Sequence, residues 1–505
     1  MTSRRYEEQL EAIKAELKTP VAAGSAGTGP ADPPCAFQRG TVLVAEEHAD
    51  WLCESGDSPL RTLRARRAAG SAGGSGLVRV RVGTATHEDL MRVPAMEPDL
   101  DVRAALGSLR YDVAGRGAMT ASPNHLIGIT NGTVCPADEP WPTQDSPSIR
   151  GVTLAPAAHR RPRVLVIDTG LVAAYKTLDL GDGVGGHKRA QETEVDQDHH
   201  RTDLIREHVG HGTFITALLK AVAPTADVFV SNALPKLGAA FEDEFGDHLF
   251  TAIAQFQETL PPDEREMWPD IISLSAGTTL YYDPQNPPSE HDQGLLALKT
   301  FMETLKEKPT LLVAAAGNNG NSIRLHPAAL AERHEFSQAV VSVGALRENP
   351  DDGRACFSDF GPWVKAFAPG ERLVADFSAA ARRLQYQHAT FDQCQFLPPS
   401  DNYRCACQAP AHDGALSHDP HTPLAEGRIA DFRTTHRARW SGTSFATPVV
   451  AGYIAQRMAV ENRADARGVY AHMRENAPRI NVAGETALKV VPEGFAVQPM
   501  DLGPQ

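Results

Sequence analysis

A serine lies in a turn of small residues that runs directly into an apolar stretch. Residues 440–455 read WSGTSFATPVVAGYIA, and this pattern predicts a helix that begins at Ser444. A helix N-terminus presents unpaired N–H groups and the positive end of the helix dipole, which favour a developing negative charge. A serine hydroxyl is a weak nucleophile at neutral pH, so Ser444 would also need a neighbouring base to do covalent chemistry.

Two upstream segments offer an acid and a base. Residues 163–170 read RVLVIDTG, an apolar run that predicts a buried parallel strand with Asp168 at its carboxyl end, where open α/β sheets place their sites. Residues 208–222 read HVGHGTFITALLKAV and place His211 at the start of an apolar helix. Taken alone, Asp168 could be an Asx turn, and His208 and His211 a hydrogen-bonded surface pair. His208 keeps that structural interpretation, because the Gly-Thr that starts the helix follows His211.

These segments together resemble the signature segments of the subtilisin-like serine proteases, the peptidase S8 family. The resemblance rests on IDTG at 167–170, HGT at 211–213 and GTSFATP at 442–448, in the order Asp, His, Ser. It covers about residues 163 to 475. Two further segments are similar to family segments: LVAAAGNNG at 312–320 to the oxyanion segment, and ISLSAG at 272–277 to the strand that pairs with the substrate backbone.

The resemblance implies a serine endopeptidase that works through an acyl-enzyme intermediate. Ser444 would attack the peptide carbonyl, and His211 would take its proton and return it to the leaving amine. Asp168 would hold the imidazole in the required tautomer. The Asn318 side-chain amide and the Ser444 backbone N–H would stabilise the oxyanion.

The resemblance also implies a substrate site and a set of partners. Ser275, Ala276 and Gly277 would bind an extended peptide or protein substrate, and Leu325 would make the first specificity pocket shallow. No cofactor is required. Structural calcium is common in the family, but the chain has no Asp-x-Asp-x-Asp-Gly loop to support it, so we expect no metal site.

Two other functions stay open at this stage. The first is a pseudoprotease, a fold kept as a binding scaffold with its groove occupied by the N-terminal region. The presence of Asp168, His211, Ser444 and Asn318 argues against it. The second is a hydrolase of small amides or esters without endopeptidase activity.

The spacing of apolar segments predicts the fold class. Apolar strand-like runs alternate with longer helix-like stretches, which indicates an α/β fold: a doubly wound, mostly parallel sheet with helices on both faces. The predicted strands are 163–168, 227–230, 270–275 and 310–316, and the predicted helices are 211–222, 242–259 and 294–306.

Composition shifts along the chain indicate five regions. We predict an N-terminal helix and flexible tether (1–38), a small α+β domain (39–135), a Pro-rich linker (136–162), a subtilisin-like domain (163–480) and a tail (481–505). The small domain weakly resembles inhibitory prodomains, and the alternative is a partner-recruiting module. Residues 130–163 could span up to ~100 Å, so a strand at 126–129 could reach the active site and act as an inhibitor.

The subtilisin-like domain carries an insertion at 371–441. It contains Cys394, Cys405 and Cys407 among several histidines, but the spacing is not that of a standard zinc site. We expect a mobile loop or small lobe that limits access to the active site.

The overall composition indicates which kinds of partner and which cellular compartment to expect for this protein. The 505-residue chain has a net charge of −14, which argues against a nucleic-acid partner. It has no apolar run long enough for a membrane span. The start, MTSRRYEEQL, lacks the apolar region of a secretory signal, and the seven cysteines are odd in number and irregularly spaced. We therefore expect a cytoplasmic protein with reduced thiols.

Overall fold

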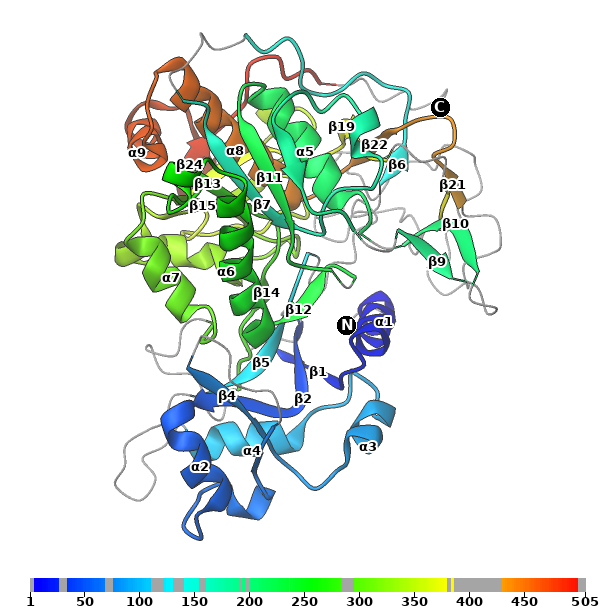
Figure 1. The fold of residues 1–505 in the computed structure, drawn as a ribbon, viewed down its shortest axis with the longest axis vertical. Helices are drawn as coiled ribbons and strands as arrows, with labels where there is room; N and C mark the ends of the chain where they lie inside the picture. Colours follow the sequence, from blue (N-terminus) through cyan, green and yellow to red (C-terminus); the bar gives the residue numbers. More distant parts are fainter. Residues whose placement is uncertain are drawn as a thin grey trace.

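The computed structural model describes two packed parts of the chain, shown one above the other in Figure 1. We call residues 4–129 the N-terminal domain and residues 140–497 the main domain. The described residues are 4–26, 34–68, 76–109, 121–129, 140–153, 160–189, 192–195, 200–206, 208–235, 237–283, 295–378, 383–385 and 429–497.

The main domain is built on a large sheet in the order β23-β24-β18-β17-β15-β13-β7-β11-β8. Neighbouring strands are parallel except β23 and β24, which form an antiparallel pair. The predicted α/β fold with a mostly parallel sheet is therefore confirmed. The strands are β7 (Arg163–Asp168), β8 (Val184–Gly186), β11 (Asp227–Asn232), β13 (Ile271–Leu274), β15 (Leu311–Ala315), β17 (Val340–Leu346), β18 (Ala366–Pro369), β23 (Arg479–Val482) and β24 (Glu485–Lys489).

Helices cover both faces of this sheet, and each face has its own apolar core. One core joins α5 (His211–Val222), α8 (Thr443–Val460) and α9 (Ala466–Asn476) to the sheet. The other joins α6 (Glu242–Glu258) and α7 (Lys299–Lys306). Helix α7 begins later than the predicted residue 294, because residues 296–298 form a turn.

The N-terminal domain is a sheet with helices packed on it. Strands β12, β5, β2, β4 and β3 follow one another in the sheet, and β1 pairs with β2. Of these, β12 (Ala239–Phe241) belongs to the main domain, so one sheet joins the two parts of the chain. The other elements are α1 (Arg4–Leu17), β1 (Val21–Ser25), β2 (Pro34–Ala45), α2 (Glu46–Glu54), β3 (Arg66–Arg67), β4 (Leu77–Arg81), α3 (His87–Arg92), α4 (Leu100–Leu109) and β5 (Ala121–Gly128).

Two predicted region boundaries are wrong. Residues 21–25 are strand β1 and not part of a flexible tether. Their small side chains, which suggested flexibility, allow close packing instead: a Cβ on Gly24 would lie 2.5 Å from the ring of Tyr281. The predicted tail from residue 481 contains β24, which pairs with β18 inside the main sheet.

The Pro-rich linker and the insertion both contact the main domain. In the linker, β6 (Trp141–Pro142) pairs with β22 (Arg437–Trp440), which also pairs with β19 (Leu373–Asp376) at the base of the insertion. A small sheet joins β9 (Thr193–Val195), β10 (Arg201–Ile205), β20 (Arg383–Gln385) and β21 (Ile429–Asp431). Residues 386–428, with the three cysteines and the predicted access-limiting loop, lie outside the described residues.

Two structural features are absent from the described ranges. These ranges contain no helix long and apolar enough to cross a membrane. The same part of the chain holds no cluster of three or more His, Cys, Asp or Glu side chains placed to bind a metal ion.

Candidate active site

Asp168 and His211 form a buried pair at the carboxyl end of β7. The His211 Nδ1 atom lies 2.9 Å from each carboxylate oxygen of Asp168, and the two side chains are 2% and 0% exposed. Asp168 Oδ1 also accepts from the backbone N–H of Thr169 at 2.7 Å. Gly212 makes the approach of α5 possible, since a Cβ there would lie 2.6 Å from the carbonyl oxygen of Gly170. The carboxylate therefore determines the orientation of the imidazole.

Ser444 is the second residue of α8, and residues on either side of it contact the His211 ring. Phe445, its neighbour in the chain, packs on the His211 ring with centroids 5.2 Å apart, and Trp440 packs on the ring edge at 5.3 Å. The Ser444 hydroxyl lies 3.5 Å from the carbonyl oxygen of Ser275, the outer limit of a hydrogen bond. The Ser275 hydroxyl donates to the Ser444 carbonyl oxygen at 2.8 Å. The start of α8 and residue 275 therefore contact each other directly.

Asn318 lies in the segment after β15 and contacts the turn before Ser444. Its Oδ1 accepts from the backbone N–H of Thr443 at 2.8 Å and from the Thr443 hydroxyl at 2.9 Å. Because an amide N–H₂ group cannot accept these bonds, Oδ1 must face Thr443. The Nδ2 donor then faces Gly442, 3.5 Å from the position of a Cβ on that glycine. The amide is thus held with its donor toward the serine turn.

Comparison with known proteins identifies the family of this chain. Residues 160–489, well over half of the chain, match the model of the subtilase family. The chain belongs to the subtilase family.

Relatives of this subtilase are distant. The thermophilic serine proteinase of Bacillus sp. (strain AK1) is 26% identical over 237 residues, 45% of this chain and 48% of the relative. Thermitase of Thermoactinomyces vulgaris is 25% identical over 218 residues, 43% of this chain and 65% of thermitase. The match thus spans about half the length of the first relative. A cold adapted subtilisin-like serine proteinase of known structure has a TM-score of 0.39 and 16% identity, over 72% of this chain and 97% of its own.

The predicted substrate-binding strand of the subtilase pairs with its own N-terminal domain. Gly277 and Gly128 form an antiparallel bridge with both backbone hydrogen bonds, at 3.0 and 3.1 Å. On the other side, β5 pairs with β12, and the N–H of Ile129 donates to the carbonyl oxygen of Gly238 at 3.1 Å. The chain at residues 126–129 therefore lies between two strands of the main domain and runs toward Ser275. Ala276, beside Gly277, is buried.

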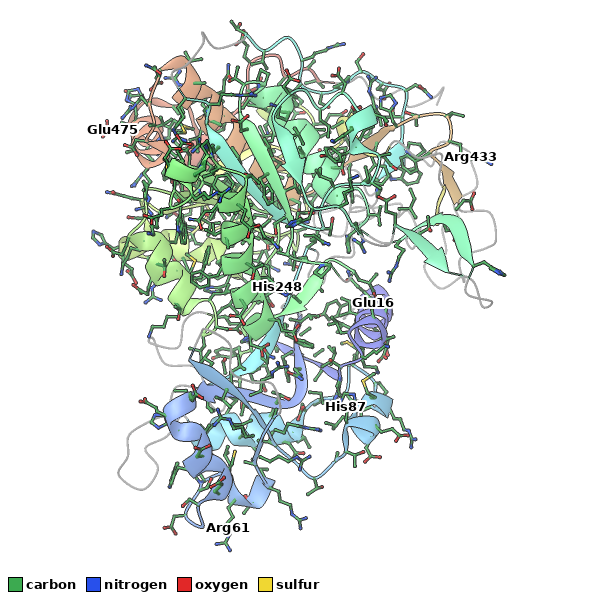
Figure 2. The ribbon with its side chains drawn as sticks, viewed as in Figure 1. Glu16, Arg61, His87, His248, Arg433 and Glu475 are labelled. Atoms are coloured by element: carbon green, nitrogen blue, oxygen red, sulfur yellow. The ribbon has the colours of Figure 1, made fainter. Side chains whose placement is uncertain are left out.

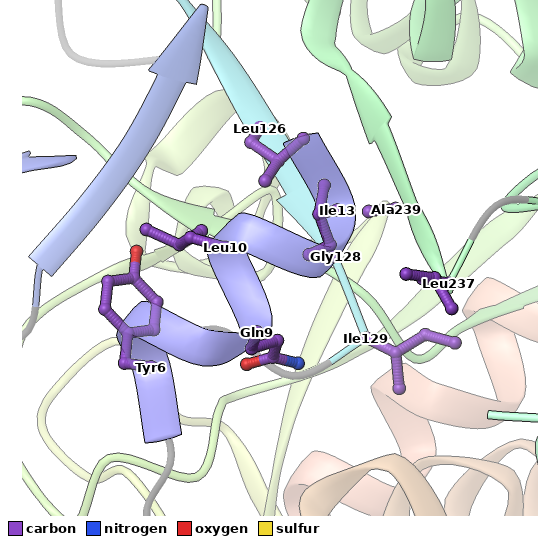
Figure 3. A pocket seen from close by; sticks show the side chains of 10 residues that line it. Tyr6, Gln9, Leu10, Ile13, Leu126, Gly128, Ile129, Leu237 and Ala239 are labelled. Carbon is purple, nitrogen blue, oxygen red and sulfur yellow. The ribbon is translucent and has the colours of Figure 1, made fainter. Parts of the chain in front are cut away.

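Helix α1 covers this paired segment (Figure 3). Tyr6, Leu10 and Ile13 are nearly inaccessible and pack in one apolar cluster with Leu126 of β5 and Leu237 of the main domain. A cavity of only about 10 Å³ remains between the helix and the segment. Glu16, labelled at the junction of the two domains in Figure 2, forms an ion pair with Arg206 of the main domain at 2.8 Å.

Buried polar contacts also join the two domains. His125 of β5 lies between Glu242, whose Oε2 is 2.8 Å from its Nδ1, and the N–H of Tyr281, which donates to its Nε2 at 3.1 Å. Both His125 and Glu242 are almost fully buried. Arg103 donates two hydrogen bonds to Asp283, at 3.0 and 3.1 Å. The interface is thus specified by directional contacts and not by apolar packing alone.

Leu325 and His326 form β16, which pairs with β14 (Thr278–Thr279) directly after the predicted substrate-binding residues 275–277. A Cβ on Gly277 would lie 2.8 Å from a methyl carbon of Leu325, so this leucine lies directly beside the strand. Burial, together with the nearby His125, Arg324 and Arg333, lowers the pKa of His326 to about 3. His326 is therefore neutral at physiological pH.

The sequence motifs did not include Asp359, which binds the backbone that follows Asn318. Thr443 lies within the motif at 442–448, but the motif does not show that Thr443 orients Asn318. Asp359 lies in the segment FSDFG, which reads as an ordinary polar turn. Such partners are distant in sequence from the residues that they position, so local pattern carries no signal for them.

Proposed function

We propose that this subtilase is a serine endopeptidase that hydrolyses peptide bonds through an acyl-enzyme intermediate. Ser444 attacks the carbonyl carbon while His211 takes its proton, and His211 then protonates the leaving amine. Asp168 offsets the transient positive charge on the imidazole. The Asn318 amide and the Ser444 backbone N–H donate to the oxyanion. Water completes the cycle by the reverse sequence of proton transfers.

The observation that carries this proposal is the buried hydrogen bond of His211 to both Asp168 oxygens, together with the contact of the His211 ring with Phe445, the residue after Ser444 at the start of α8. A base with a fixed tautomer next to a serine in the field of a helix N-terminus is the requirement for an activated hydroxyl. The 3.5 Å contact of the Ser444 hydroxyl with Ser275 does not argue against the role, since catalytic hydrogen bonds are often loose without substrate.

We further propose that the N-terminal domain inhibits the enzyme. Support comes from the pairing of Gly128 with Gly277, because a substrate held by the same strand would need the same backbone groups. The helix α1 and the His125–Glu242 contact add to the hold on this segment. Substrate entry then requires that residues 126–129 leave the strand.

A catalytically silent scaffold is the competing function, and the occupied substrate-binding strand favours it. The two are separated by the reactivity of Ser444, because only an activated serine reacts with a fluorophosphonate probe. We expect labelling of the full chain, no labelling of Ser444→Ala, and unchanged labelling of Ser337→Ala, whose hydroxyl bonds the carbonyl oxygen of His334.

Turnover on two substrate types completes the test. Cleavage of casein by the labelled protein supports an endopeptidase, whereas turnover of chromogenic esters without casein cleavage would indicate a small amide or ester hydrolase. Equal labelling of the wild type and Ser444→Ala would refute the assignment of the nucleophile.

A further inference from the structure

We propose that Asp359 is a positioning residue of the oxyanion site, which holds the backbone after Asn318 so that the amide donor is in place before the reaction. The proposal rests on the proposed protease function. It assigns a role to a buried acid that the catalytic mechanism does not otherwise use.

Asp359 binds the oxyanion segment through three donors. Its Oδ1 accepts from the backbone N–H groups of Asn319, at 2.8 Å, and Asn321, at 3.1 Å. Its Oδ2 accepts from the Asn319 side-chain amide at 3.2 Å. Two of these donors belong to the residue next to Asn318, so movement of the carboxylate would move the Asn318 backbone directly.

Asp359 also donates a hydrogen bond to the oxyanion segment. The backbone N–H of Asp359 donates to the carbonyl oxygen of Gly317 at 2.9 Å, so Asn318 lies between two residues that Asp359 binds. Gly317 has a φ of +110°, and a Cβ on it would lie 2.3 Å from Oδ2 of Asp359. The carboxylate thus occupies the space that a side chain at 317 would fill, and the segment closes around it.

Thr443 holds Asn318 from the opposite side. Its hydroxyl donates to Oδ1 of Asn318 at 2.9 Å and accepts from the N–H of Gly317 at 3.1 Å. Thr443 is part of α8 and moves with Ser444, whereas Asp359 belongs to the segment between β17 and β18. The position of the Asn318 amide relative to Ser444 therefore depends on both anchors.

The anchor is a buried group that titrates in the range where the enzyme would work. Asp359 is 0% exposed, and burial raises its pKa to about 7 although its hydrogen bonds and Arg354 act in the opposite direction. Arg354 donates to the carbonyl oxygens of Ala355 and Cys356, at 3.1 Å each. Above pH 7 the carboxylate is ionised and accepts strongly. Below it, the neutral acid keeps only a carbonyl oxygen that accepts more weakly, so the hold of Asp359 on the segment should weaken.

The test compares the full-length wild type with Asp359→Asn on a small peptide substrate between about pH 5.5 and 8.5. Rates are normalised to the serine labelled by a fluorophosphonate probe. The variant keeps the shape, and the Asn319 amide can turn so that its oxygen accepts from the new N–H₂ group. We expect kcat to fall ~10-fold at pH 8 with KM within about twofold, because the donor acts in the transition state.

The pH dependence separates positioning from a purely structural role. The wild-type to variant ratio of kcat should fall toward one below about pH 6, where the wild-type Asp359 carboxylate is protonated. Asp270→Asn is the matched control, because Asp270 is a buried acid that accepts from the backbone N–H of Arg163 at 2.8 Å, at the opposite end of the sheet. The ratio of wild-type kcat to Asp270→Asn kcat should stay near one at every pH.

A second measurement does not require that Asp359→Asn folds. The wild-type to Asn318→Ala ratio of kcat should itself shrink ~10-fold between pH 8 and 6, since Asp359 acts through Asn318. A ratio that is constant with pH in both comparisons overturns the inference while leaving the protease assignment intact. Absence of fluorophosphonate labelling in the wild type would overturn the protease assignment, and the inference with it.

Discussion

At the scale of single residues, Asp168 is the most constrained group of the site. Its two oxygens share the His211 N–H and it accepts from Thr169, so an amide at this position would present a donor where the imidazole needs an acceptor. We expect Asp168→Asn to lower kcat ~10⁴-fold on a peptide substrate while the melting temperature stays close to that of the wild type. Asp227→Asn, at a half-exposed ion pair with Arg161, should keep wild-type turnover. Retention of more than about a tenth of the activity in Asp168→Asn would contradict the assigned role.

His326 makes the stability of the main domain depend on pH. Its pKa is lowered from the ordinary 6.5 to about 3, so below pH 6.5 the unfolded chain takes up a proton that the native protein does not. The native state is therefore destabilised as the pH falls, by about 2 kcal/mol between pH 7.5 and 5 from this group alone. In a Ser444→Ala background, which prevents self-digestion, His326→Gln should reduce the pH dependence of the free energy of unfolding by this amount.

The measurement is urea unfolding at the two pH values. His334→Gln is the control, because His334 is an exposed histidine of the same domain. An unchanged pH dependence in His326→Gln would show that His326 becomes protonated without cost in the native state.

At the scale of elements, α1 packs against residues 126–129. Leu10 is 2% exposed within the cluster that joins the helix to β5 and to Leu237. Leu10→Ala should cost about 2–5 kcal/mol of packing energy, which weakens the hold of α1 on this segment. We expect a higher initial rate of small-peptide hydrolysis by the full chain.

Glu7→Ala serves as the control for that change, since Glu7 is an exposed residue of the same helix. A Leu10→Ala protein that is destabilised in the N-terminal domain but hydrolyses peptides at the wild-type rate would show that α1 does not restrain the substrate-binding strand.

At the scale of the whole molecule, the two domains share a sheet and a buried polar contact. Glu242 is fully buried, and its Oε1 accepts from the N–H of Ala297 at 2.8 Å while Oε2 binds His125. His125→Ala removes one partner of a buried charged group, which costs several kcal/mol in comparable sites. We expect weaker docking of the N-terminal domain, faster peptide hydrolysis and easier cleavage of the N-terminal domain by an added protease.

Glu88→Gln provides the comparison within the same domain. Glu88 and Arg92 form an exposed pair on α3, so its loss should change neither hydrolysis nor protease sensitivity. If His125→Ala released no activity although Ser444 reacts with the fluorophosphonate, the N-terminal domain would be a docking module and not an inhibitor.

The elements that carry the chemistry were readable from local pattern. The apolar run that ends in Asp168 and the apolar helices that begin near His211 and Ser444 predict a parallel sheet, and the observed sheet agrees with this prediction. Such predictions succeed because the spacing of apolar side chains along a segment shows which face of the strand or helix is buried. The family resemblance pointed to Asn318 and residues 275–277 for the same reason, since each lies in a short contiguous motif.

Long-range contacts could not be predicted in this way. The small residues at 21–25 read as a tether but form β1, because they pair with β2 and pack against the ring of Tyr281, which is far away in the sequence. The region after residue 480 reads as a tail but supplies β24 to the main sheet. Likewise, the anchoring of Asn318 by Asp359 and the pairing of Gly128 with Gly277 depend on distant chain segments that meet only when the core has formed. Motifs and periodicity indicate which side chains of a segment are buried. Which other segment they pack against is determined by the tertiary structure.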